Sequence, residues 1–304
     1  MQAEHLPADR FVQRPARAKL NLYLHVTGRR ADGFHLLESL VAFAGIGDTV
    51  AARQATGLSL TVEGPFAGPL QAAPAHDNLI WRAADALRAL AAQRGLDVGG
   101  AMLALDKHLP IASGIGGGSA DAAAALHALK TLWCLDVTLE DLKKIGASLG
   151  SDIPACIAGT PALMRGIGDI LDPVPPLPRV PLVLLNPGVA MPTPPVYKAF
   201  AASGALTTTP RPAPTGPFAA TRDVVAALAA ATNDLEAPAI SLCPAIRTCL
   251  DSLVEEGALL ARMSGSGATC FGIFASEQAA ADASARLFNR HRGWWVAPTA
   301  LAAN

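Results

Sequence analysis

The segment 109–126, LPIASGIGGGSADAAAAL, contains four glycines within five positions and a serine on either side of them. Glycines allow backbone N–H groups to approach an anion closely, and a helix that follows adds unpaired N–H groups and the positive end of its dipole. Ser113 and Ser119 add hydroxyl donors. We therefore interpret the segment as a phosphate-binding loop. A tight strand-to-helix turn that binds nothing is the alternative, and the entropic cost of so many glycines disfavours it.

This loop lacks the Gly-Lys-Ser/Thr ending of the common P-loop, so a cation for the phosphate must come from elsewhere. Lys19 and Asn21 lie two positions apart in ARAKLNLYLHV (16–26), so both project from one face of a strand. From this segment alone, an ordinary exposed strand face is the favoured interpretation, and side chains that point into a common cleft are the alternative.

Two further segments leave their alternatives open. Asp152 in GSDIPACI either caps a helix that begins near Pro154 or presents its carboxylate to a substrate, and both roles can coexist. The glycines of RMSGSGATCFGIF (262–274) either let backbone approach a ligand or form a plain hairpin turn.

The elements that position these residues mix strands and helices without regular βαβ alternation, which predicts an α+β fold. Strict alternation in 16–26 predicts a half-buried strand. A boundary near 159–163 precedes a proline-rich stretch, and 203–218 is a Pro/Thr/Ala-rich loop that we expect to be mobile. We also expect strands at 101–110, 182–188, 258–276 in two parts and 293–301. We expect helices at 77–95, 119–133, 138–150, 222–236, 244–257 and 277–291.

Composition narrows the classes of function. The 304 residues are 51% hydrophobic and 16% charged, enough to bury a substantial core, and the net charge of −1 leaves no basic footprint for nucleic acid or an anionic membrane. No signal peptide and no transmembrane run is evident, and five scattered cysteines fit no zinc pattern. We expect reduced thiols, a cytoplasmic location and a small-molecule partner.

The four motifs, in this order and at these separations, resemble those of the GHMP kinases. The segments that carry the resemblance extend from Pro15 to Phe274 and include PARAKLNLYLHVTGRRADGFHLLESLVAF, HDNLIWRAA, DKHLPIASGIGGGSADAAAAL, LGSDIPACIAG, NPGVAMPTPPVYKAF and MSGSGATCFGIF. The ADGFH segment is the specific part. It resembles the members that phosphorylate the 2-hydroxyl of a cytidine diphospho-polyol in the non-mevalonate isoprenoid pathway.

The resemblance implies a two-domain GHMP kinase fold. Residues 12–160 would form an ATP-binding domain similar to ribosomal protein S5, and residues 161–304 a ferredoxin-like domain. ATP is the implied co-substrate, with Mg²⁺ and Ser119 as a ligand of the ion. The resemblance gives no oligomeric state.

The resemblance also implies residue roles. Lys19 and Asp152 would be the catalytic pair, so the missing cation comes from the first strand. The substrate-binding residues would be Asn21, Tyr23, Phe34, His35, Thr193 and Tyr197, with Phe34 and Tyr197 stacking on the cytosine ring and His35 bonding to its edge. Phe34 departs from the tyrosine usual in the family. The ATP-binding residues would be Asn78, Lys107, Pro110, Ile111, Ala112, Ser113, Gly114, Ile115, Gly116, Gly117, Gly118, Ser119, Ala120 and Asp121.

Three alternatives to this function differ in substrate or class. Another GHMP kinase, acting on homoserine or a mevalonate derivative, would have no base to stack, and the ADGFH and PTPPVYKAF segments argue against it. A catalytically silent nucleotide-binding regulator is disfavoured by the retention of Lys19 and Asp152. An RNA-binding module is disfavoured by the net charge near zero.

Overall fold

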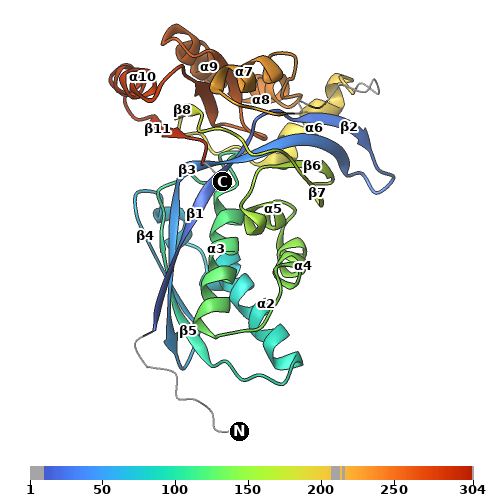
Figure 1. Ribbon diagram of the computed structural model, residues 1–304, viewed down its shortest axis with the longest axis vertical. Helices are drawn as coiled ribbons and strands as arrows, with labels where there is room; N and C mark the ends of the chain where they lie inside the picture. Colours follow the sequence, from blue (N-terminus) through green and yellow to red (C-terminus); the bar gives the residue numbers. More distant parts are fainter. Residues whose placement is uncertain (1–9, 207–212, 214–215, 303–304) are drawn as a thin grey trace. The chain divides into compact units, whose positions relative to one another are not determined.

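The computed structural model describes residues 10–206, 213 and 216–302, and the chain divides into two compact units (Figure 1). The first unit contains residues 1–17, 47–109 and 117–158, and the second contains 18–46, 110–116 and 159–304. The chain therefore crosses between the units within two strands, at both ends of the glycine loop and between residues 158 and 159. The predicted division at 160/161 stays a prediction.

The first unit packs helices against one face of a small sheet (Figure 1). The second half of β3 pairs antiparallel with β5, and β5 pairs parallel with β4. Its apolar core is rich in alanine, which lets α3 pack closely against its neighbours. The elements are β1 (Phe11–Asn21), β3 (His35–Ala55), β4 (Ser59–Glu63), α1 (Gly68–Gln71), a 3₁₀ turn (Ala75–Asp77), α2 (Leu79–Gln93), β5 (Gly100–Asp106), α3 (Gly117–Leu132), α4 (Leu139–Leu149) and α5 (Ile153–Ala158).

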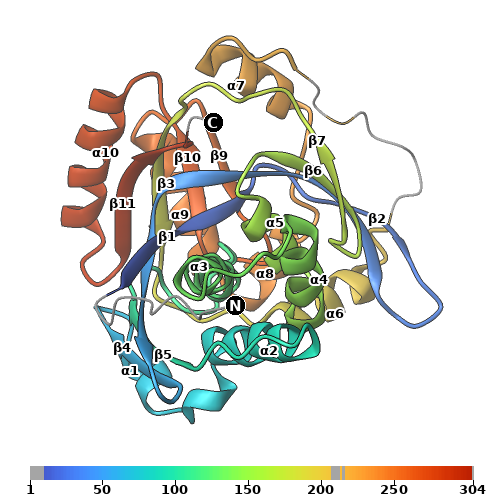
Figure 2. The same cartoon turned by 60° about the horizontal axis from the view of Figure 1, so that its bottom comes forward.

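In the second unit, α9 and α10 cover an antiparallel sheet of order β11-β8-β10-β9 (Figure 2). The first half of β3 pairs antiparallel with β2 and β6, and β6 pairs with β7. The elements are β2 (His25–Arg29), β6 (Ala162–Gly166), β7 (Ile170–Pro173), β8 (Pro181–Asn186), α6 (Thr193–Ser203), α7 (Thr221–Ala229), α8 (Glu236–Leu242), α9 (Ala245–Glu255), β9 (Leu260–Met263), β10 (Cys270–Ile273), α10 (Glu277–Arg290) and β11 (Trp295–Ala300).

Local signals in the sequence explain where several helices begin. Thr138 accepts a hydrogen bond from the Asp141 N–H, and the Asp141 carboxylate accepts one from the Thr138 N–H, which forms the predicted start of α4. The Asn78 side chain caps α2 in the same way, by accepting from the Ile80 N–H. These caps satisfy N–H groups that have no partner within the helix.

The prediction of a half-buried strand over 16–26 is wrong in two respects. The strand β1 ends at Asn21 and β2 begins at His25, and every residue from Ala18 to Val26 is buried on both faces. Alternation of polar and apolar residues predicts one solvated face only if nothing covers that face. Here it is covered within the second unit by the glycine loop and by the turn after β9, so Lys19 is only 2% exposed.

The single helix predicted over 222–236 is also wrong, because α7 ends at Ala229 and α8 begins at Glu236. The residues between them pair with the backbone of Leu24 instead of continuing the helix. The loop predicted over 203–218 falls in part on residues 207–212 and 214–215, which lie outside the described residues.

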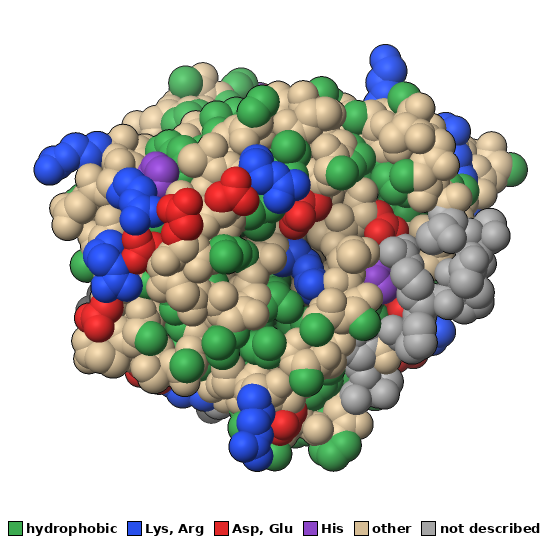
Figure 3. Space-filling model, turned by 90° about the horizontal axis from the view of Figure 1, so that it is seen from above, with side chains coloured by type: hydrophobic (Ala, Val, Ile, Leu, Met, Phe, Trp, Pro, Cys, Tyr) green, Lys and Arg blue, Asp and Glu red, His purple; other side chains and the backbone are tan. Residues whose placement is uncertain are grey.

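The surface carries both signs of charge. Figure 3 shows Lys and Arg side chains interspersed with Asp and Glu on the face that it presents, and ion pairs such as Arg290 with Glu255, at 2.8 Å, join α10 to α9. All five cysteines belong to the described residues, and none of them is in a disulfide. In the described ranges no helix combines the length and the apolar character that a bilayer crossing requires.

Candidate active site

The glycine loop, residues 110–116, is held in the second unit by its carbonyl groups. The Ala112 carbonyl accepts from Met191 N at 2.9 Å, and the Ser113 carbonyl accepts from Thr269 N at 3.0 Å. The Gly114 carbonyl accepts from Ser264 Oγ at 3.0 Å, and the Ile115 carbonyl accepts from Lys19 N at 2.9 Å. Within the described part of the chain, the N–H groups of residues 114–116 donate no hydrogen bond. A loop whose carbonyls are tied down while its N–H groups stay unpaired is suited to bind an anion.

The turn after β9, residues 264–269, forms the platform under this loop, and we call it the glycine turn. Ser264 Oγ donates to the Gly114 carbonyl and accepts from the Asn21 N–H at 3.1 Å, so one side chain joins the loop to the first strand. Gly114 has a φ of +77°, and a Cβ there would lie 2.4 Å from the Ser264 carbonyl oxygen. Only glycine satisfies both the backbone conformation and this close approach.

Lys19 and Asn21 lie side by side beneath the loop. The Lys19 ammonium donates to Asn21 Oδ1 at 3.2 Å, and Asn21 Nδ2 donates to Ser39 Oγ at 2.7 Å. The alkyl chain of Lys19 runs past Gly116, where an added Cβ would be 3.2 Å from two of its carbons. The geometry therefore fixes a buried cation next to a loop with unpaired N–H groups, which is a suitable setting for a phosphate.

The residues predicted to bind a base lie in the turn before β3, at the start of β3 and in α6, all in the second unit. His35 stacks on Tyr197 with ring centroids 4.9 Å apart and 28° between planes, while Phe34 is 61% exposed in the turn before it. Burial lowers the pKa of His35, and the nearby Arg29 lowers that pKa further, which favours the neutral ring. An exposed aromatic next to a neutral imidazole is suited to stack on and hydrogen-bond to a planar base.

Tyr23 and Thr193 have hydrogen-bond partners within the protein. The Tyr23 hydroxyl donates to Glu38 Oε1 at 3.2 Å, and burial, followed by the charge of Glu38, raises the pKa of Tyr23. Thr193 begins α6 and shares a hydrogen bond of 3.0 Å with Ser266 of the glycine turn. The start of α6 is thus tied to the same turn as the glycine loop.

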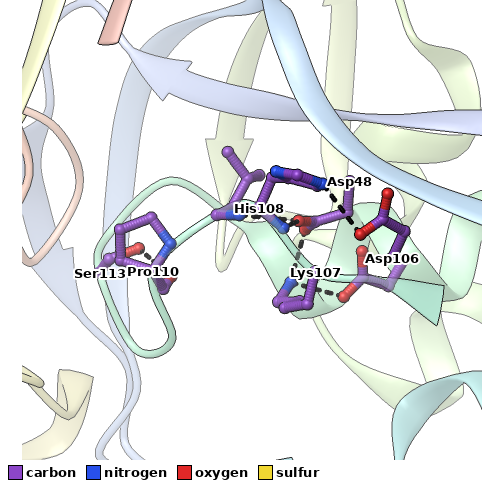
Figure 4. A network of polar contacts seen from close by, with 8 residues as sticks. Asp48, Asp106, Lys107, His108, Pro110 and Ser113 are labelled. Carbon is purple, nitrogen blue, oxygen red and sulfur yellow. Dashed lines mark hydrogen bonds and ion pairs between the residues drawn. The ribbon is translucent and has the colours of Figure 1, made fainter. Parts of the chain in front are cut away.

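In the first unit, a buried ion cluster holds the segments on either side of the loop (Figure 4). Lys107 Nζ lies 2.5 Å from Asp48 Oδ2 and 2.7 Å from Asp121 Oδ2, and these three side chains are at most 4% exposed. Asp48 Oδ1 accepts from the N–H groups of His108 and Leu109 at 2.6 and 2.7 Å. The cluster therefore joins the end of β5, the start of α3 and β3.

Two carboxylates share one ammonium in this cluster, and the pKa values of Asp121 and Lys107 are both raised. Burial raises the pKa of Asp121 above its ordinary value, against the attraction of Lys107. Burial by itself would lower the pKa of Lys107, but the charges of Asp121 and Asp48 together raise it. Lys107 is thus a charged group whose ammonium is already paired with Asp48 and Asp121.

The remaining predicted residues also lie in the first unit. Asn78 caps α2, Asp152 immediately precedes α5, and Gly117, Gly118, Ser119 and Ala120 form the first turn of α3. Asp121 Oδ1 is buried and has no hydrogen-bond partner among the described residues. Ser119 and Asp121 are two positions apart in α3, so their side chains project from different sides of the helix. The Ser119 hydroxyl, in the first turn, is an oxygen donor of the kind that Mg²⁺ takes beside phosphate and water. No group of three metal-binding side chains gathers within the ranges described.

Sequence analysis missed three polar residues that organise this region: Asp48, Ser39 and Asn233. All three are buried and each makes more than one hydrogen bond. Asp48 had a signal, because it is a carboxylate within an otherwise apolar strand pattern, AFAGIGDTVAA. Ser39 and Asn233 had none, since their partners come from segments far away in the sequence.

Comparison with known proteins agrees with this geometry. Residues 78–160 match the GHMP kinases N terminal domain, and residues 218–292 match the GHMP kinases C terminal domain. A 4-diphosphocytidyl-2-C-methyl-D-erythritol kinase of Cereibacter sphaeroides is 52% identical over 288 residues, which cover 94% of this chain and 98% of that protein. The same-named protein of Paramagnetospirillum magneticum is 48% identical over 94% of this chain and 97% of its own length.

Solved structures give the same relationship. A crystal structure of 4-(cytidine 5'-diphospho)-2C-methyl-D-erythritol kinase superposes with a TM-score of 0.74 at 33% identity and covers 96% of this chain and 100% of that one. A homoserine kinase of Cytophaga hutchinsonii superposes with a TM-score of 0.69 at 17% identity, covering 100% of this chain and 98% of that one. At this lower identity the similarity concerns the fold alone.

Proposed function

Because the chain belongs to the 4-diphosphocytidyl-2-C-methyl-D-erythritol kinases of the GHMP kinase family, we propose that it transfers the γ-phosphoryl group of ATP to the 2-hydroxyl of 4-diphosphocytidyl-2-C-methyl-D-erythritol. The observation that carries the proposal is the glycine loop. Four of its carbonyls accept hydrogen bonds, the N–H groups of residues 114–116 donate none to any part of the chain that the structure describes, and the buried Lys19 side chain runs alongside the loop.

The ATP phosphates would bind at the N–H groups of the loop and of the first turn of α3. The loop residues 110–116 supply backbone donors, and the N-terminus of α3 supplies the positive end of its dipole. Residues 12–160 would be the ATP-binding domain and 161–304 the second domain of the kinase. Asn78 and Lys107 would lie near the nucleotide, with Lys107 acting from within its ion cluster.

Asp152 and Lys19 would act on the acceptor hydroxyl and on the transferring group. Asp152 orients the hydroxyl and accepts its proton, while Lys19 offsets negative charge on the phosphoryl group. Because the transition state of phosphoryl transfer is loose, positioning and charge stabilisation contribute more than the strength of the base. Asn21, which accepts a hydrogen bond from Lys19, would hold the ammonium in place.

Mg²⁺ would supply further charge neutralisation for the phosphates when bound. The residue that fits it is Ser119, through its hydroxyl in the first turn of α3.

The cytidine end of the acceptor would stack between Phe34 and Tyr197, with His35 on its edge. The exposure of Phe34 and the stacking of His35 on Tyr197 support this assignment. We also propose a cytoplasmic location, no nucleic-acid or membrane partner, and Tyr23 and Thr193 as residues that shape the substrate site through Glu38 and Ser266.

The experiment is ADP release from Mg-ATP with 4-diphosphocytidyl-2-C-methyl-D-erythritol, homoserine, mevalonate or no acceptor. We expect turnover with the cytidine compound alone. Turnover with a different alcohol would retain the kinase activity and contradict the cytosine site. Binding of ATP without turnover of any acceptor would contradict the proposed activity and support a silent nucleotide-binding regulator.

A further inference from the structure

We propose that Asn233 is a positioning residue for phosphoryl transfer, because it fixes the glycine turn on which the glycine loop and the first strand rest. The proposal rests on the proposed function above. Asn233 lies in the ATNDLE segment between α7 and α8, outside the four motifs that predicted the site.

The Asn233 side chain uses both of its N–H donors and its oxygen for hydrogen bonds inside the second unit. Its Nδ2 donates to the carbonyls of Met263 and Gly265, both at 2.8 Å, and its Oδ1 accepts from the Leu235 N–H at 2.9 Å. Two donors and one acceptor in this arrangement require an amide, and they fix which end of the amide is nitrogen. The side chain is 6% exposed, so water does not compete for these bonds.

The two carbonyls that Asn233 holds are at the start of the glycine turn, on either side of Ser264. Gly265 has a φ of +55°, and a Cβ on it would lie 2.8 Å from the Gly114 carbonyl oxygen and 3.3 Å from Asn21 Oδ1. The Asn233 amide therefore fixes a peptide segment that contacts both Gly114 of the glycine loop and Asn21, which accepts a hydrogen bond from Lys19. A shift of this segment moves both.

The backbone around Asn233 is anchored to Leu24 and to β2 independently of its side chain. Leu24 N donates to the Thr232 carbonyl at 3.0 Å, and Asp234 N donates to the Leu24 carbonyl at 2.8 Å. The Asp234 carboxylate accepts from the Val26 N–H at 2.8 Å. Asn233 thus joins a segment fixed to one side of the site to the turn on the other side, which distinguishes it from an asparagine that merely fills the core.

Loss of the two Asn233 N–H donors leaves the hydrogen bonds to the backbone of Leu24 and Val26 in place and releases only the glycine turn. A misplacement of about 1 Å in a catalytic arrangement can cost about 100-fold in rate. Asn233→Asp keeps the shape of the side chain and its acceptor oxygen, but it replaces both donors with a second oxygen that faces two carbonyls. We expect its kcat/KM for ATP to fall by about 100-fold.

The test measures kcat, KM for ATP and for the acceptor, the affinity for a non-hydrolysable ATP analogue, and the melting temperature. Ser252→Ala is the matched control, since it removes a buried hydrogen bond to His291 in the same unit but away from the glycine turn. We expect the control to keep its kcat at a similar loss of melting temperature. The effect of Asn233→Asp should be larger on kcat and KM for ATP than on KM for the acceptor.

The proposal is overturned if folded Asn233→Asp keeps kcat and both KM values within about twofold of the unchanged protein, or loses no more than the control. If Asn233→Asp does not fold, Asn233→Ser, which can donate one hydrogen bond, is expected to show a smaller loss in the same parameters, and unchanged parameters would again overturn the proposal. If the unchanged protein turns over no acceptor, the proposed function fails. Weaker binding of the ATP analogue by Asn233→Asp would then still support the role of Asn233, and unchanged binding would contradict it.

Discussion

Gly114 and Gly267 pack backbone against backbone: a Cβ on Gly114 would lie 2.7 Å from the Gly267 nitrogen and 2.8 Å from its carbonyl oxygen. These residues are far apart in the sequence and belong to two different glycine-rich motifs. Real Cβ atoms do not approach backbone atoms this closely, so the contact requires glycine at position 114. The two motifs therefore form one structural unit, in which each determines the position of the other.

This contact makes Gly114→Ala a sharp test. The methyl group would meet the backbone of Ser264 and Gly267, and alanine at a φ of +77° is strained as well. We expect kcat/KM for ATP to fall by about 100-fold or more. Gly257→Ala is the matched control, because Gly257 has a φ of +90° with no atom within 4 Å of an added Cβ. Equal losses in the two variants would attribute the effect to backbone strain alone.

The buried ion cluster should contribute to stability because it is paired. Lys107→Met leaves Asp48 and Asp121 without their cation, and breaking a buried pair costs about 3–5 kcal/mol of unfolding free energy. Lys143→Met, which removes an exposed pair with Glu140, should cost no more than about 1 kcal/mol. Urea denaturation measures both values.

A second substitution separates the loss of pairing from the loss of packing. Asp121→Asn in the Lys107→Met background removes one of the two unpaired charges, so we expect it to restore part of the lost free energy of unfolding. No recovery would show that the Lys107 side chain contributes through its packing.

The assigned catalytic pair predicts large rate effects without unfolding. Asp152→Asn removes a proton acceptor, and general-base contributions of about 10²–10⁴-fold correspond to roughly 3–5 kcal/mol of barrier. Lys19→Ala should lose a comparable amount, because it removes the cation that offsets the phosphoryl charge. Steady-state kinetics with circular dichroism as a folding check measure this. Near-normal turnover of either variant at an ordinary KM would exclude the pair.

The base-stacking assignment predicts a selective change in KM. Phe34→Ala and Tyr197→Ala should raise KM for the cytidine substrate far more than KM for ATP, since stacking on an aromatic ring contributes about 1–3 kcal/mol per base. Phe34 is 61% exposed, so its removal should leave the melting temperature almost unchanged. An unchanged KM for the acceptor in both variants would remove the assignment.

His35 gives this site a pH dependence of known sign. Its pKa is lowered from 6.5, so the neutral ring, which we propose binds the base, persists to lower pH than an unperturbed imidazole would allow. KM for the acceptor should therefore stay constant from about pH 8 to pH 6.5 and rise below that range. His35→Gln cannot titrate, so the same assay should show no such rise. A rise that persists in the variant would assign the titration to another group.

The amino-acid sequence by itself determined the family, the α+β two-domain fold and the main helices and strands, and these were confirmed. The reason is that such features depend on local rules. A glycine-rich run, a capping box at Thr138 or apolar periodicity acts over a few residues, and the sequence displays them directly. The site residues Lys19 and Asp152 stay predictions.

Only the tertiary structure decided what covers the first strand and what supports the loop. Alternation predicted a solvated face for Lys19 and Asn21, but the glycine loop and the glycine turn bury them. Asp48 pairs with Lys107, 59 residues away in the sequence, and Asn233 donates to the Met263 carbonyl, 30 residues away. Burial and hydrogen-bond pairing between distant segments are properties of the packed chain, so no pattern within either segment could predict them.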